Sequence, residues 1–329
     1  MQELGETYII VRSPTILISG IVLPVIMALK SMQRVRTAVS ISLSAVAMNV
    51  CLNYVFIFGH LGFRPMGVEG AALATTISTL VELILLVTVL RIQQSELTSH
   101  LVEYGRWTKS HFAEVMRNSI PTTINEMMWS LGTSTYNAAY GRISASAIAA
   151  ASAADIVAHV FTKTIYSCGD AALVIVGEEL GRSNKEEAWT VSGRLIRICI
   201  MMGIIGGGLL AAISLPVSEL FGFTEEGTRS LRLILCIYGA AMPLKVYNAS
   251  IITGILRAGG DVRFAMITEV STIWLIGVPI VFLCSLVFRF PVWMVILAVQ
   301  MEDVVKGIII TRRYLSRKWM NNKVENIKC

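Results

Sequence analysis

Runs of about 20 apolar residues recur along the whole chain, and this feature restricts the fold more than any other. A run of that length crosses the hydrocarbon core of a bilayer as an α-helix, which satisfies every backbone polar group internally. Nine runs are expected to form helices, at residues 7–29, 37–58, 69–91, 119–141, 150–176, 196–217, 232–256, 264–287 and 291–311. The sequence therefore predicts an all-α polytopic membrane protein.

The composition excludes several other classes of protein. Of the 329 residues, 54% are hydrophobic and 15% charged, and the mean hydropathy is +0.66. Soluble domains carry about 25% charged residues, so an ordinary soluble enzyme is excluded. The net charge of +6 comes from short segments between apolar runs, which argues against a nucleic-acid partner. No His-Glu-x-x-His motif, Ser/His pair or phosphate loop falls at membrane depth, so an enzyme is not expected, and the six cysteines form neither a disulfide nor a zinc pattern.

The distribution of basic residues predicts the orientation in the cell membrane. Alternate connections and the C-terminal segment hold 19 Lys and Arg residues, against five on the opposite side. Cytoplasmic loops carry the excess of basic residues, so the C-terminus is expected in the cytoplasm. The first run is long enough to span and lacks a small-residue cleavage site, so it is expected to remain as a helix.

Domain organisation follows from one long polar connection and one internal repeat. Residues 93–118 are expected to form a cytoplasmic linker between two bundles, and residues 313–329 a basic cytoplasmic tail. The segment Val35–Ala38 after the first run resembles Val262–Ala265 after the seventh, so the first three helices echo the last three. Residues 119–312 then form a complete six-helix lobe. Residues 1–92 form an incomplete lobe, its last three helices, with about nine helices present of an expected twelve.

Several motifs resemble one family, the multidrug and toxic compound extrusion (MATE) transporters. In the first lobe the segments NVCLNYVFIFG (49–59) and GVEGAALAT (67–75) are similar to the family. In the second lobe the segments VGEELG (176–181), GILRAGGD (254–261) and WLIGVP (274–279) follow in the order expected for the family. The resemblance covers essentially the whole chain, although the family's first three helices and the acidic residue on the first of them are absent from it.

The resemblance implies a twelve-helix, two-lobed antiporter that exports organic compounds, chiefly small organic cations, in exchange for Na⁺ or H⁺. The implied partners are these cations and the lipid bilayer, with no cofactor or metal beyond the coupling ion, and the oligomeric state stays open. Two alternatives remain. One is a flippase of related architecture for a lipid-linked precursor, and the other is a non-transporting fragment.

Placing an ionisable side chain at membrane depth costs free energy, so such residues are functional candidates by default. In the fourth run, Glu126 beside Asn125 is the first candidate for ion coupling, because desolvation favours the protonated form of a carboxylate. The family resemblance points to the same residue. In the fifth run, Asp155 and Lys163 lie on one helical face, either as part of an ion pathway or as a self-neutralising stripe.

Three further candidates follow in the second lobe. Lys245 and Tyr247 come directly after Pro243, and Lys245 is expected either to line the cavity or to pair with Glu126 or Asp155. Glu269 lies in the eighth run among threonines. The ninth run carries Glu302 and Lys306 at i,i+4 spacing, which we interpret as a structural ion pair.

The first lobe contains a candidate cation site without a carboxylate. Asn49 and Asn53 are one helical turn apart, and Thr75 lies at the start of the part of the next helix that is expected to face them. Their oxygen atoms are hard ligands of the kind that Na⁺ prefers, and the three residues resemble the cation site of the family's N-terminal lobe. Helix packing through amide hydrogen bonds is the alternative explanation.

Overall fold

The chain forms two all-helical units in the computed structural model, which describes residues 2–93 and 109–320. The first unit comprises residues 1–109 and the second residues 110–329. No strand occurs in the described ranges, so the all-α fold class predicted from the sequence is confirmed there. Most of the expected linker, residues 94–108, and the end of the expected tail, residues 321–329, lie outside the described residues.

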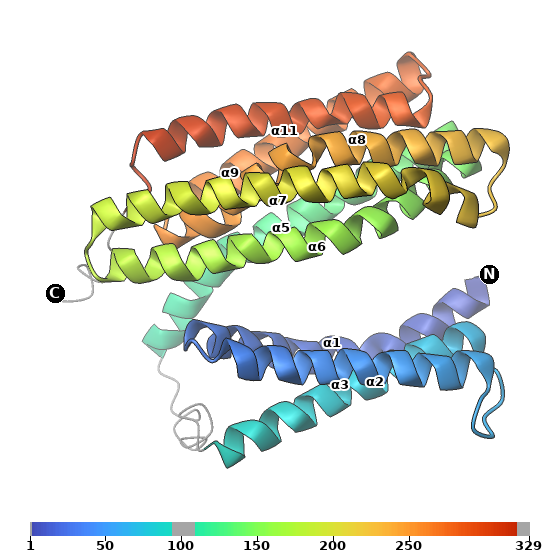
Figure 1. Ribbon diagram of the computed structural model, residues 1–329, viewed down its shortest axis with the longest axis horizontal. Helices are drawn as coiled ribbons and strands as arrows, with labels where there is room; N and C mark the ends of the chain where they lie inside the picture. The colour runs from blue at the N-terminus through green and yellow to red at the C-terminus, as the bar shows by residue number, and fades with distance from the viewer. Residues whose placement is uncertain (1, 94–108, 321–329) are drawn as a thin grey trace. The chain divides into compact units, whose positions relative to one another are not determined.

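The N-terminal unit consists of three long helices that pack side by side (Figure 1). They are α1 (Gln2–Ser31), α2 (Val35–Phe58) and α3 (Gly67–Ile92). Helix α2 ends at Gly59, whose φ of 74° is readily available to glycine and whose N–H bonds the carbonyl of Val55. The core of the unit includes Ile26, Leu29 and Leu86, each no more than 7% exposed.

The C-terminal unit contains six helical segments in the described residues (Figure 1). The first three are α5 (Lys109–Ile143), α6 (Ala145–Gly181) and α7 (Lys185–Leu220). Helix α8 (Glu225–Ala249) continues as a π-helical segment, Ser250–Leu256. The fifth segment comprises α9 (Val262–Thr272), a π-helical segment (Ile273–Gly277), α10 (Val278–Phe282) and a second π-helical segment (Leu283–Val287), and the sixth is α11 (Val292–Leu315). Helix α5 begins at Lys109, within the range expected for the linker.

Side-chain caps fix where three of these helices begin. Ser144 accepts a hydrogen bond from the N–H of Ala147, Asn184 from that of Glu187, and Thr224 from that of Gly227. Each cap satisfies a backbone donor that the first helical turn leaves without a partner.

The two segments identified as repeats begin helices with the same backbone geometry. Helix α2 follows Arg34, with φ −88° and ψ 44°, and α9 follows Asp261, with φ −86° and ψ 40°. The residue before each also has positive φ, 60° at Gln33 and 74° at Gly260. The similarity between Val35–Ala38 and Val262–Ala265 therefore corresponds to the same turn between consecutive helices.

Seven of the described helices are long and apolar enough to cross a membrane, and α5 and α11 are not among them. Helix α11 carries five charged residues, from Glu302 to Arg313, and α5 begins in a charged and polar stretch. Both were expected as spans, so the total of nine spans stays a prediction. Seven apolar helices in one chain are the architecture of a polytopic membrane protein.

The end of α11 packs against the rest of its unit instead of extending away as a tail. Tyr314 stacks between Trp189 and Trp319, and Trp319 is fully buried. Arg313 pairs with Asp261 at 2.6 Å, and Arg317 with Glu186 at 2.8 Å. Residues 313–320, expected as the start of the tail, are therefore part of the folded unit.

Helices α7 and α8 approach so closely that only glycine fits at their crossing. A Cβ on Gly207 would collide with the carbonyl of Gly239, whereas a Cβ on the adjacent Gly208 would meet nothing within 4 Å. We expect Gly207→Leu to destabilise the unit by about 1–3 kcal/mol through overpacking, measured as a lower midpoint of thermal unfolding in detergent. Gly208→Leu is the matched control, and an equal loss in both variants would contradict the crossing as the cause.

Candidate ion-coupling site

A small polar cluster lies between α2 and α3 in the N-terminal unit. Asn49 Nδ2 donates to Ser78 Oγ at 3.1 Å and to Thr75 Oγ1 at 3.5 Å, and Asn53 Nδ2 donates to Asn49 Oδ1 at 2.9 Å. Asn53 Oδ1 is buried and has no hydrogen-bond partner among the described residues. The three residues proposed from the sequence are thus brought together, and their bonds are compatible with both a packing and a binding role.

The same two helices, α2 and α3, also contain a carboxylate that accepts a hydrogen bond from a hydroxyl group. Ser42 Oγ donates to Glu82 Oε1 at 2.8 Å across α2 and α3. Glu82 is the counterpart of Glu302 in the internal repeat, but the residue four positions on is Leu86, where the second copy has Lys306. The two copies therefore differ in the partner of this carboxylate, a hydroxyl group in the first and an ammonium group in the second.

The C-terminal unit contains a buried ion-pair network centred on Lys306. Lys306 Nζ lies 2.7 Å from Glu302 Oε1 and 3.5 Å from Asp303 Oδ1, all within two turns of α11. The side chains of Lys306 and Glu302 are 9% and 8% exposed. Such a pair is tolerated at membrane depth because each charge is compensated by its neighbour. The ion pair predicted between Glu302 and Lys306 is present in the structure.

Helices α8 and α5 are joined to this network by side chains of their own. From α8, Lys245 Nζ lies 3.5 Å from Asp303 Oδ2, and Asn248 Nδ2 donates to the carbonyl oxygen of Asp303 at 2.9 Å. From α5, the Tyr136 hydroxyl donates to Glu302 Oε2 at 2.7 Å. The network therefore links three helices of the unit.

The π-helical segment Ile273–Gly277 leaves space for the Tyr136 hydroxyl. A Cβ on Gly277 would overlap that hydroxyl and would lie 2.8 Å from Glu302 Oε2. A glycine at this position thus lets the tyrosine reach the carboxylate. Irregular helical turns of this kind are frequent at functional sites.

Two more carboxylates of the unit are bonded to uncharged donors. The Tyr238 hydroxyl donates to Asp155 Oδ1 at 2.9 Å, and the Lys245 ammonium lies 5.4 Å from the centre of the Tyr238 ring. Between α5 and α9, Asn125 Nδ2 donates to Glu269 Oε2 at 2.8 Å. The group of ionisable side chains then holds four carboxylates (Asp155, Glu269, Glu302 and Asp303) and two ammonium groups (Lys245 and Lys306).

The structure corrects three expectations about individual residues. Glu126, expected to be desolvated, has a side chain that is 61% exposed in its unit and lies 3.4 Å from Arg257. Lys245 pairs with a carboxylate, as one of the two alternatives predicted, but this carboxylate is Asp303 and not Glu126 or Asp155. Tyr247, proposed from the sequence as a residue of the ion-coupling site or substrate cavity, has its hydroxyl 2.6 Å from that of Thr311, in a groove between α8 and α11.

The stripe expected along α6 is divided between two environments. Asp155 is half-buried and bonded to Tyr238, whereas Lys163 is exposed. The hydrogen bond of Asp155 therefore goes to another helix. Asp155 is therefore bonded to Tyr238 and does not form the self-neutralising pair with Lys163.

Sequence reasoning missed the residues that other helices contribute to the network. Tyr136 and Tyr238 were not singled out for it, because an isolated aromatic residue in an apolar run is typical of packing. Asn248 lies three residues from Lys245, one turn of a helix, and this spacing was the available signal. No group of three His, Cys, Asp or Glu side chains suited to a metal ion occurs in the described ranges.

An all-helical chain with buried ion pairs inside apolar helices belongs to the polytopic membrane proteins, and comparison with known proteins identifies the kind. The MatE family model matches residues 121–283. The chain is 22% identical over 300 residues to the uncharacterized transporter YisQ of Bacillus subtilis, covering 89% of this chain and 64% of that protein. It is 27% identical over 258 residues to the probable multidrug resistance protein NorM of Bacillus cereus, covering 75% of this chain and 54% of that protein.

Solved structures share the fold of this chain. An inward-facing structure of a multidrug resistance MATE family transporter of the MOP superfamily superposes with a TM-score of 0.73 at 17% identity, covering 96% of this chain and 72% of that one. Residues 121–283 therefore form a MatE family domain, and the chain has the fold of the MATE transporters. It spans little more than half the length of the curated NorM relative and about two thirds of YisQ.

Proposed function

We propose that this protein is a secondary antiporter that exports organic cations by alternating access, coupled to the entry of Na⁺ or H⁺. The names of the relatives, a transporter and a probable multidrug resistance protein, support export of small compounds from the cell. The C-terminus is proposed to be cytoplasmic, from the distribution of basic residues.

The observation that carries the proposal is the imbalance of charge in the C-terminal unit. Four carboxylates face two ammonium groups, and Asp155 and Glu269 are each bonded to an uncharged donor. With His159, one turn from Asp155 on α6, in its neutral form, this partly buried group is neutral only with two further positive charges, whether protons or bound cations. Asn125 Oδ1 and Asn248 Oδ1 are buried acceptors without a partner among the described residues, which also favours a cation.

In the proposed mechanism, Asp155 and Glu269 are the ion-binding groups. The ion pairs of Lys306 and Lys245 hold the carboxylates of α11 in place, and a proton or Na⁺ at each of Asp155 and Glu269 neutralises the remaining charge. An ion that binds one conformation of the lobe more tightly than the other shifts the equilibrium between them. Asn49, Asn53 and Thr75 of the N-terminal unit form a second, weaker candidate site, because it lacks a carboxylate.

Ethidium efflux from everted membrane vesicles of an exporter-deficient host tests this function. We expect efflux to follow an imposed H⁺ or Na⁺ gradient, and the gradient that works identifies the ion. Efflux independent of both gradients would contradict coupling. Absence of efflux from a chain that is folded and inserted would instead favour the non-transporting alternative, and movement of a lipid-linked precursor would favour the flippase.

A further inference from the structure

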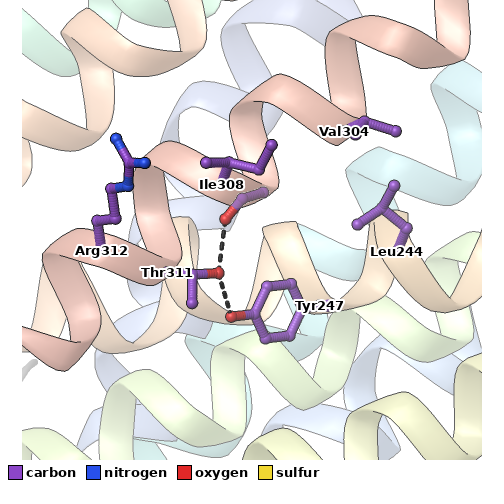
Figure 2. A pocket seen from close by; sticks show the side chains of 7 residues that line it. Leu244, Tyr247, Val304, Ile308, Thr311 and Arg312 are labelled. Atoms are coloured by element: carbon purple, nitrogen blue, oxygen red, sulfur yellow. Dashed lines mark hydrogen bonds between the residues drawn. The ribbon is translucent and has the colours of Figure 1, made fainter.

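A groove of about 410 Å³ lies between α8 and α11, and the network does not use it (Figure 2). Leu244 of α8 and Val304 and Ile308 of α11 form its apolar walls. Gly307 lies where the two helices approach, and a Cβ there would be 3.3 Å from Leu244 Cδ1. A glycine at this position thus allows the two helices to approach closely at the groove.

The polar atoms inside the groove are already bonded to one another. The hydroxyl groups of Tyr247 and Thr311 are 2.6 Å apart, and Thr311 Oγ1 also donates to the carbonyl of Gly307 at 2.6 Å (Figure 2). These hydroxyl groups therefore have few hydrogen bonds left to make with water. An occupant of the groove is therefore expected to be apolar along this length.

Arg312 lies at one end of the groove, and it differs from the arginines that follow it. Arg313 and Arg317 are paired with Asp261 and Glu186. Arg312 is exposed and has no carboxylate within ion-pair distance among residues 2–93 and 109–320. The side chains that line the groove include no carboxylate. The charge at this end is therefore complementary to an anion.

The dimensions and surroundings of the groove match one leaflet of a bilayer. From Val304 to Arg312 the helix rises about 12 Å, against about 15 Å for the hydrocarbon of a single leaflet. Exposed apolar residues continue along the same face of α11, where Leu297, Met301, Ile308 and Leu315 are 51% to 62% exposed. A face of this kind is typical of contact with lipid.

We propose that the groove between α8 and α11 binds an anionic phospholipid, with an acyl chain along Leu244, Val304 and Ile308 and the phosphate at Arg312. A guanidinium group binds phosphate in a bidentate manner. A zwitterionic headgroup would bring an ammonium group to an end that offers no carboxylate, so the anionic lipid is preferred. By bridging α8 and α11, the lipid would brace the two helices that carry Lys245 and Lys306 on their inner sides.

Native mass spectrometry of the purified full chain, exchanged into equal amounts of phosphatidylglycerol and phosphatidylcholine, tests the proposal. We expect retention of phosphatidylglycerol to exceed that of phosphatidylcholine by about fivefold, and the preference to vanish in Arg312→Gln. Arg263→Gln, which removes another exposed arginine, is the control for general surface charge and is expected to keep the preference. A preference that survives Arg312→Gln, or that Arg263→Gln removes equally, would overturn the proposal.

A second pair of variants tests the acyl chain. Val304→Trp fills the groove and is expected to lower retention of both lipids, whereas Met301→Trp, on the same face but outside the groove, is expected to retain them. An unchanged thermal midpoint in both variants would establish that the fold is intact. If Val304→Trp changed the oligomeric state and left lipid retention unaltered, the occupant would be protein and the proposal would be wrong.

Discussion

Lys306→Met is expected to destabilise the C-terminal unit by about 3–5 kcal/mol, because it removes the cation that compensates two buried carboxylates. Lys306 lies 2.7 Å from Glu302 and 3.5 Å from Asp303, and its side chain is 9% exposed. Methionine fills a similar volume, so the loss is electrostatic and leaves packing largely intact. Thermal unfolding in detergent should record a fall in the midpoint on the order of 10 °C.

Two further variants isolate the charge as the cause. Lys163→Met removes an exposed lysine of α6 and is expected to change stability by less than about 0.5 kcal/mol. The double variant Glu302→Gln with Lys306→Met is expected to recover most of the loss, because Asp303 keeps its partner Lys245. No recovery in the double variant would mean that Lys306 stabilises the unit by packing.

The helices were predictable because their signal is local. Each apolar run needs only its own length to satisfy its backbone in a bilayer, and the turn before Val35 is repeated before Val262. The Glu302 and Lys306 pair was predictable for the same reason, since one turn of helix brings i and i+4 together. Boundaries were less accurate where charged residues extend a helix, as at Lys109 in α5.

The partners between helices were not predictable in the same way. Glu126 was the first candidate from the sequence and Asp155 another. Which of the two faces the core of its unit depends on how its helix packs against other helices. The structure exposes Glu126 beside Arg257 and directs Asp155 to Tyr238. One turn of helix separates Lys245 from Asn248, and this spacing gives no information that their common partner is Asp303, 55 residues from Asn248.

Asp155→Asn is expected to remove the coupling between the ion and the organic cation while the protein stays folded. If Asp155 and Lys163 formed a self-neutralising stripe, this change would leave Lys163 without a partner, but Asp155 is bonded to Tyr238 and Lys163 is exposed. Asparagine can still accept the tyrosine hydrogen bond, and it removes only the charge and the titratable proton. Ethidium affinity, measured by fluorescence anisotropy, should depend on the coupling ion by about 5–150-fold in the parent and little in the variant.

Tyr238→Phe and Glu126→Gln complete this comparison. Tyr238→Phe keeps the Asp155 carboxylate but removes its donor, so the ion dependence should be altered in strength and not abolished. Glu126→Gln changes an exposed residue whose partner is Arg257, and we expect it to keep most of the ion dependence. If Glu126→Gln abolished the ion dependence and Asp155→Asn preserved it, the coupling group would be Glu126, as the sequence and the family resemblance first indicated. The buried carboxylates would then serve only to join the helices.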